Sequence, residues 1–289
     1  MITRNKKKKL VIGTAQFGLK YGITNKKGKT PFKEIKKIFD LQKKYKLNFL
    51  DTAQAYNFEK TYRRFNLKNF NLIIKLDPFK NRKNEEKLLV KSVVRILQKF
   101  KLKNIFCLMI HHSNDLLKKG NTKLFKTLKF LKDKRYVKKI GFSTYGTENI
   151  LKILKKYKFD VVQTTFNPFD RRILKNDIYK QLKKKGVEIH VRSIFLQGLL
   201  LSKKKRIPIK LRKFENQFKK WNNFVKNSEL SPLDICLNYV LSQDFDKVIV
   251  GINNHKQFKE ILDCKNRKIK IPESISTNKN FLINPYNWS

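Results

Sequence analysis

The chain has 289 residues, which is enough for one large domain or two small ones. Hydrophobic residues make up 40% of it, with 23 Phe and 10 Tyr, so it can bury a sizeable core and is not an intrinsically disordered protein. The 10 Gly and 7 Pro exclude a collagen-like chain, and no run approaches the roughly 20 apolar residues of a membrane-spanning helix.

The charge balance is strongly basic, with 69 Lys and Arg against 22 Asp and Glu and a net charge of +47. Such a balance is typical of proteins that bind nucleic acid or an anionic membrane. In this chain the lysines are spread along the whole length and recur on the outer faces of predicted helices, as at Lys36 and Lys43. We therefore expect a solvated lysine coat, with no specific nucleic-acid partner and no membrane partner. A surface selected to bind polyanions is the alternative.

The cysteine pattern indicates a reducing compartment. Cys107, Cys236 and Cys264 are widely spaced and form no CxxC motif, so neither a disulfide framework nor a zinc site is expected. Met1–Leu19 superficially resembles a signal peptide, but only three apolar residues stand between its basic run and Gly13. We interpret it as mature sequence of a cytoplasmic protein.

Short apolar runs rich in Val, Ile and Phe alternate with longer segments of helical period. The runs predict eight strands, at Leu10–Gly13, Asn48–Asp51, Leu72–Lys75, Ile105–His111, Ile140–Ser143, Val161–Thr164, Glu188–Arg192 and Lys247–Gly251. The longer segments predict helices at Pro31–Tyr45, Glu85–Phe100, Asn149–Tyr157, Ile178–Lys185, Pro232–Ser242 and Lys256–Leu262, with a stunted one around Glu59–Phe65. Ser231 is the expected N-cap before Pro232.

Eight strand–helix units predict a single-domain (β/α)₈ barrel over residues 1–289. A doubly wound open sheet is the alternative fold. A Rossmann site has no support, because no strand is followed by G-x-G-x-x-G and the chain has no P-loop.

Polar side chains stand at the carboxyl ends of the predicted strands. These are Asp51, Lys75, His111, Ser143 and Gln163. Active residues of such barrels gather at this rim, so we expect these side chains to meet there.

Over about Leu10 to Leu262, the sequence resembles the aldo-keto reductase family. The motifs that support the resemblance are Gly13-Thr14-Ala15-Gln16-Phe17-Gly18, Asp51-Thr52-Ala53-Gln54-Ala55-Tyr56, Ile73-Ile74-Lys75, Leu108-Met109-Ile110-His111, Gly141-Phe142-Ser143, Val162-Gln163 with Phe166-Asn167, Gln197-Gly198-Leu199-Leu200, and Val248-Ile249-Val250-Gly251 with Gln257. Each is short, but their order and spacing together are specific.

The resemblance implies a catalytic tetrad of Asp51, Tyr56, Lys75 and His111. Reduction of a carbonyl by hydride needs a proton donor at the developing alkoxide, and a free Tyr has a pKa of about 10. A Lys cation beside Tyr56 is expected to lower that pKa, while Asp51 holds the ammonium and His111 orients the carbonyl. His112 is the neighbouring candidate, and the resemblance favours His111.

The resemblance also implies NADPH, or NADH, extended over the barrel mouth without a metal. The matching cofactor positions are Gly13, Thr14, Ser143, Thr144, Gln163, Arg192, Ser193, Leu196, Gly198, Gly251, Asn253, Lys256, Gln257 and Glu260. Ser and Gln supply the donors and acceptors that a carboxamide needs. Lys256 is the candidate for a 2′-phosphate.

Several positions depart from the family pattern. Thr144 replaces the usual Asn, Ile261 replaces an adenine-contacting Asn, and Arg192 replaces a Tyr that stacks on the nicotinamide. The loop after Tyr56 lacks the usual glycine and is short. The aromatic tail within residues 263–289 either closes the substrate pocket or packs outside the barrel.

We therefore predict that the protein is an NADPH-dependent reductase of an aldehyde or ketone. A sugar-derived carbonyl compound is the suggested substrate class. The expected partner is that small molecule, and the expected state is a monomer or homodimer. An NADP(H)-binding regulatory barrel with little turnover is one alternative function, and a basic polyanion-binding protein is another.

Overall fold

Eight parallel strands close into a barrel in the order of the sequence, with β1 paired to β8. The computed structural model describes residues 1–78, 83–118, 121–202 and 207–288. The strands are β1 (Leu10–Gly13), β2 (Phe49–Ala53), β3 (Asn71–Leu76), β4 (Ile105–Ile110), β5 (Val137–Ser143), β6 (Val161–Thr165), β7 (Glu188–Arg192) and β8 (Lys247–Gly251). The predicted (β/α)₈ barrel is therefore confirmed, and the open-sheet alternative is wrong.

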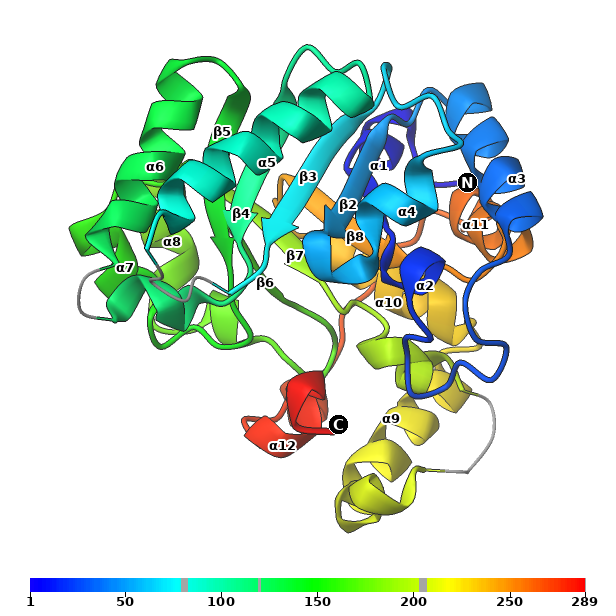
Figure 1. The fold of residues 1–289 in the computed structure, drawn as a ribbon. Coiled ribbons are helices and arrows are strands. Elements are labelled where there is room, and N and C mark those ends of the chain that lie inside the picture. The colour runs from blue at the N-terminus through cyan, green and yellow to red at the C-terminus, as the bar shows by residue number, and fades with distance from the viewer. Residues whose placement is uncertain (79–82, 119–120, 203–206, 289) are drawn as a thin grey trace.

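Helices surround this barrel on its outside and at its two ends (Figure 1). They are α1 (Arg4–Lys8), α2 (Ala15–Gly18), α3 (Phe32–Lys44), α4 (Phe58–Tyr62), α5 (Glu85–Lys99), α6 (Thr122–Asp133), α7 (Ile150–Lys156), α8 (Ile178–Lys184), α9 (Glu215–Asn227), α10 (Pro232–Leu241), α11 (His255–Asp263) and α12 (Asn280–Ile283). Five of these helices were not predicted: the short α1, α2 and α12, and the longer α6 and α9, although α6 buries Leu124, Leu128 and Leu131 on one face. The Ser231 cap is confirmed, since its Oγ accepts the Asp234 N–H at 3.0 Å.

Two apolar layers stabilise the barrel. Its interior is packed by Val11, Ile73, Cys107, Met109, Val161 and Ile249. The other face of each strand packs against the helices, which makes these strands apolar on both faces. Continuous apolar runs rather than alternating ones are therefore the correct signal for this sheet, and the runs were visible in the sequence.

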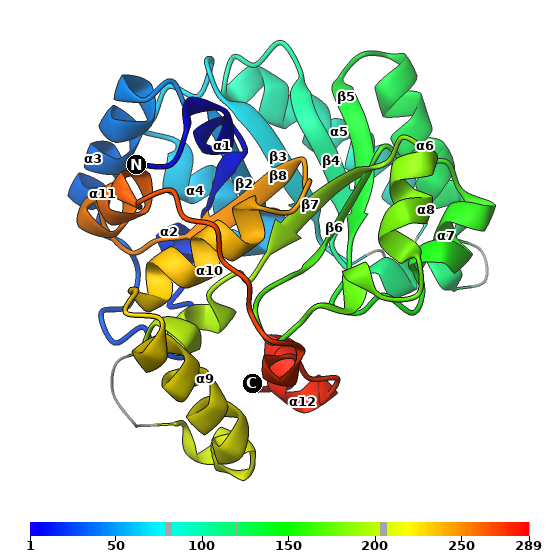
Figure 2. The same cartoon turned by 180° about the vertical axis from the view of Figure 1, so that it is seen from behind.

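The carboxyl ends of the strands open toward α9, α12 and the loops between them, while α1 lies at the opposite end of the barrel (Figure 1). After α11, the chain passes α10 on the outside of the barrel and then reaches α12 (Figure 2). Asn238 in α10 holds this passage, donating to the Lys265 carbonyl at 2.8 Å and accepting from the Arg267 N–H at 3.0 Å. Within the described ranges, no helix combines the length and the apolar character that a bilayer crossing requires.

Candidate active site

A buried ion pair lies at the base of the barrel mouth. Asp51 on β2 and Lys75 on β3 are 4% and 1% exposed, and the Lys75 ammonium donates to an Asp51 carboxylate oxygen. The other carboxylate oxygen accepts from Gln163 Nε2 at 2.7 Å. Burial lowers the pKa of Lys75, and the Asp51 charge opposes that shift. The Asp51 carboxylate thus stabilises the charged form of Lys75 at a site where burial alone disfavours that charge.

Tyr56 and His111 lie close to this pair. Tyr56 ends a single 3₁₀ turn after β2, and the Lys75 ammonium is 6.0 Å from the centre of its ring. The His111 ring follows β4 and meets the Tyr56 ring edge-on, with 6.0 Å between centroids. Gly18 in α2 packs directly on the Tyr56 backbone, so a Cβ there would stand 1.6 Å from the Tyr56 carbonyl oxygen. The four predicted catalytic residues therefore lie at one site.

The direction of the Tyr56 pKa differs from the sequence-based expectation. Burial raises the pKa of the Tyr56 phenol, the charge of Asp51 adds to the rise, and Arg192 opposes it. Lys75 does not cancel this rise, because its charge is paired with Asp51. The net direction is therefore upward, opposite to the lowering expected from Lys75 alone.

The His111 imidazole is neutral. Burial lowers its pKa to about 3, and the charge of Lys75 contributes in the same direction. A neutral ring retains one N–H donor and one acceptor nitrogen.

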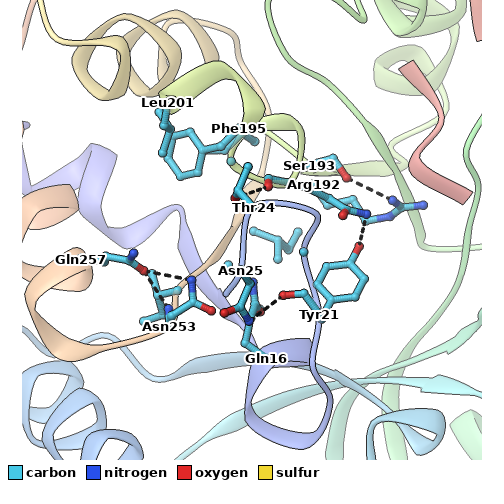
Figure 3. A pocket seen from close by; sticks show the side chains of 18 of the residues that line it. Gln16, Tyr21, Thr24, Asn25, Arg192, Ser193, Phe195, Leu201, Asn253 and Gln257 are labelled. Carbon is cyan, nitrogen blue, oxygen red and sulfur yellow. Dashed lines mark hydrogen bonds between the residues drawn. The ribbon is translucent and has the colours of Figure 1, made fainter. Parts of the chain in front are cut away.

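The four residues line a cavity of about 470 Å³. In Figure 3, Arg192 and Tyr21 lie on one side of it, and Asn253 and Gln257 lie on the other. The predicted cofactor positions that line it are Gly13, Arg192, Ser193, Gly198, Gly251, Asn253, Gln257 and Glu260.

The remaining predicted cofactor positions do not line the cavity. Ser143 and Gln163 are fully buried on paired strands, and no residue that the structure describes forms a hydrogen bond with Ser143 Oγ or Gln163 Oε1. Thr14 donates to the Asp51 carbonyl, and the Thr144 hydroxyl donates to the Gly146 carbonyl. Leu196 is buried, whereas Lys256 is exposed.

The family model described as the aldo/keto reductase family matches residues 9–275. The chain belongs to this family. Among solved structures it resembles the holo form of the aldo-keto reductase AKR11C1 from Bacillus halodurans, with 15% identity, a TM-score of 0.71 and 94% of each chain covered. It also resembles the glycerol dehydrogenase AKR11B4 from Gluconobacter oxydans, with 17% identity and a TM-score of 0.68 over 91% of this chain and 88% of that one. The comparison with curated proteins finds no significant match.

This aldo/keto reductase is therefore an oxidoreductase, and its family implies NAD(P)H-dependent reduction of carbonyl groups. The described residues contain no cluster of three side chains able to hold a metal ion.

Several cavity residues of this aldo/keto reductase were missed in the sequence. Tyr21, Thr24 and Asn25 belong to the loop after α2, and Gln197 belongs to the loop after β7. The two loops are joined, because Gln197 Oε1 accepts the Ile23 N–H at 2.8 Å and the Gln197 carbonyl accepts the Thr24 hydroxyl at 2.8 Å. The sequence signals for them were the polar, glycine-containing composition of the first loop and the place of Gln197 in the motif Gln197-Gly198-Leu199-Leu200.

An aromatic rim borders the mouth of this aldo/keto reductase. The ring centroids of His111 and His112 are 4.9 Å apart. The Tyr286 ring lies 6.4 Å from His112 and 6.2 Å from Tyr145. Tyr286 comes from the carboxy-terminal segment, whose Trp288 indole donates to the Phe281 carbonyl at 2.7 Å. The end of the tail thus reaches the mouth, after the preceding part has passed along the outside of the barrel.

Proposed function

We propose that this enzyme reduces an aldehyde or ketone with NADPH, and that Tyr56 donates the proton. The observation that supports this most directly is the buried Asp51–Lys75 pair beside Tyr56 and His111, at the wall of one cavity. Such a constellation provides a proton donor, a neutral hydrogen-bond donor and a fixed cation around one point.

The cavity wall opposite Arg192 and Tyr21 fits a phosphate-containing cofactor. Asn253 and Gln257 lie there at the N-terminus of α11, where backbone N–H groups favour a phosphate. Among the described residues, Asn253 Oδ1 is a buried acceptor without a hydrogen-bond partner. A hydroxyl or N–H donor of a dinucleotide would relieve the cost of burying this atom unpaired.

The basic surface favours the extra phosphate of NADPH over NADH, although Lys256 itself lies outside the cavity lining. Both dinucleotides should therefore be compared in one assay, and we expect the lower KM for NADPH.

When bound, the reduced nicotinamide supplies the hydride. Tyr56 then gives its proton to the oxygen of the former carbonyl group, and the nearby Lys75 cation stabilises the phenolate left behind. Neutral His111 donates its N–H to the same oxygen and orients the substrate. Asp51 keeps Lys75 charged and in place.

The test is Tyr56→Phe, which removes the hydroxyl and keeps the ring that faces His111. We expect kcat for a panel of aldehydes and ketones, sugar-derived ones included, to fall by roughly 10²- to 10⁴-fold, the usual contribution of a general acid. NADPH binding, followed by its fluorescence, should be retained. Wild-type rates in this variant would refute the role of Tyr56. Wild-type protein that binds NADPH but reduces no carbonyl would instead indicate a regulatory barrel.

A further inference from the structure

An arginine that has no carboxylate partner among the described residues lies in the wall of the active-site cavity. Arg192 ends β7 and lines the same cavity as Tyr56 and His111. Within the described part of the chain, no carboxylate lies in ion-pair distance of Arg192, whereas Arg172 pairs with Asp170 at 2.9 Å. A half-buried cation without a counter-ion is costly, so its presence beside the reacting groups needs a ligand to explain it.

The guanidinium is held in one place. Its centre stands 3.9 Å from the middle of the Tyr145 ring, one terminal nitrogen donates to the Thr144 carbonyl at 3.1 Å, and the other reaches the Ser193 hydroxyl at 3.4 Å. A guanidinium has five N–H donors, so these contacts leave some unused. The result is an oriented fork of the kind that binds carboxylate and phosphate oxygens in pairs.

The charge of Arg192 reaches residues on several sides of the cavity. Burial raises the pKa of Tyr21 and of Tyr56, and Arg192 opposes both rises. Burial also lowers the pKa of His111, and Arg192 adds to that shift. The space in which Tyr56 and His111 would receive a carbonyl is therefore within the field of this cation.

We propose that Arg192 makes the enzyme selective for carbonyl substrates that carry a carboxylate or phosphate group, bound by its guanidinium while the carbonyl faces Tyr56. This inference rests on the proposed function. An anionic substrate neutralises the cation, while a neutral one leaves it without a counter-ion. The aromatic rim through Tyr145 and Tyr286 would bound the carbon skeleton between the two polar ends.

A phosphate of the cofactor is the other source of the same chemistry, because the expected cofactor positions Ser193, Leu196 and Gly198 follow Arg192 in the chain. The experiment therefore uses 4-carboxybenzaldehyde and 4-nitrobenzaldehyde, whose substituents share a shape and differ in charge. The change in the ratio of their kcat/KM values between wild type and variant isolates the effect of charge. The intrinsic reactivity of each aldehyde cancels in this comparison, and any loss through the cofactor affects both aldehydes equally.

In Arg192→Met we expect the carboxy-to-nitro ratio of kcat/KM to fall roughly 10- to 100-fold, as for loss of a hydrogen bond to a charged group. Arg192→Lys keeps the charge without the fork and should recover part of the ratio. An unchanged ratio in Arg192→Met would overturn the proposal. An equal fall for both aldehydes, together with a higher Kd for NADPH, would assign Arg192 to a cofactor phosphate and would overturn it as well.

A wild-type enzyme that reduces neither aldehyde would count against the proposed function. The anion site would then be tested by a binding measurement. Calorimetric titration of terephthalate and of neutral terephthalamide into the protein with NADPH provides this reading. We expect terephthalate to bind at least tenfold more weakly to Arg192→Met than to wild type, with a smaller change for the diamide. Equal terephthalate binding by the two proteins would refute the proposal independently of turnover.

Discussion

His111 should not titrate in the physiological pH range. Burial and the Lys75 charge both disfavour the imidazolium and lower its pKa to about 3, so the folded protein keeps the ring neutral above that pH. In the unfolded chain the ring takes up a proton near pH 6.5. Folding therefore opposes this protonation, and stability contributed by the neutral ring is lost as the pH falls from about 6.5 toward 3.

The measurement is an NMR titration of the His111 ring, assigned by its loss in His111→Gln. We expect a constant Cε1 shift between about pH 8 and pH 5, because the folded pKa lies far below its reference value. A titration midpoint near pH 6.5 would show that the His111 ring is solvated. Protonation of His111 would then make kcat depend on pH in this range.

The sequence was sufficient to identify the candidate site residues, but not to predict how these residues interact with one another. Asp51 and Lys75 lie in the carboxyl-terminal halves of β2 and β3 and His111 directly follows β4, so parallel strands bring them to one rim, and Tyr56 follows from the family motif. The direction of the Tyr56 pKa could not be predicted, because it depends on how deeply the phenol is buried and on the pairing of Lys75. The same holds for Arg192, whose lack of a carboxylate partner among the described residues becomes visible only when the strands are closed into a barrel.

The loop that positions Tyr56 depends on contact with α2. Gly18 leaves no room for a side chain, since its Cβ would stand 1.6 Å from the Tyr56 carbonyl oxygen. Gly18→Ala must therefore displace the turn that ends in Tyr56. We expect kcat/KM to fall by about 100-fold, the usual cost of misplacing a catalytic group by about 1 Å, and stability to fall by roughly 1–3 kcal/mol, as for overpacking.

The predicted change in kcat/KM of Gly18→Ala is measured by carbonyl reduction, and the predicted loss of stability is measured by thermal unfolding. Gly28→Ala is the control variant. Gly28 lies in the following loop, where a Cβ would meet nothing within 4 Å. The control should lose about 1 kcal/mol for its left-handed backbone and keep its activity. Equal activity of the two variants would mean that Tyr56 is not seated by Gly18.

Helices and strands could be predicted where a local pattern of apolar residues marks the buried side. Segments whose conformation depends on contacts with distant parts of the chain were missed. All eight strands were recognised, because burial on both faces leaves an unbroken apolar run. The loop that contains Thr24 gave no such signal, since its partner Gln197 lies 173 residues further along the chain. Helices α6 and α9 are amphipathic, so their apolar stripes were detectable in the sequence.

At the scale of the whole molecule, the charge of the surface and the charge of the cavity have different origins. With 69 basic and 22 acidic residues, most lysines cannot find a carboxylate, and they remain solvated on the outside. Inside the barrel mouth, by contrast, Lys75 is paired with Asp51 and the guanidinium of Arg192 is fixed by stacking. The surface attracts any anion, whereas the cavity holds its cations in defined positions.

This distinction predicts how salt acts on binding. A lysine coat binds polyanions by releasing their counter-ions, so retention on heparin or on RNA should fall by roughly 10³- to 10⁵-fold in affinity between about 0.05 M and 0.2 M salt. NADPH bound in the cavity also relies on hydrogen bonds and apolar contacts, so its Kd, measured by fluorescence at the same salt concentrations, should rise far less. Selective binding of one RNA sequence or structure that persists at about 0.2 M salt would contradict the coat and indicate a surface selected for nucleic acid.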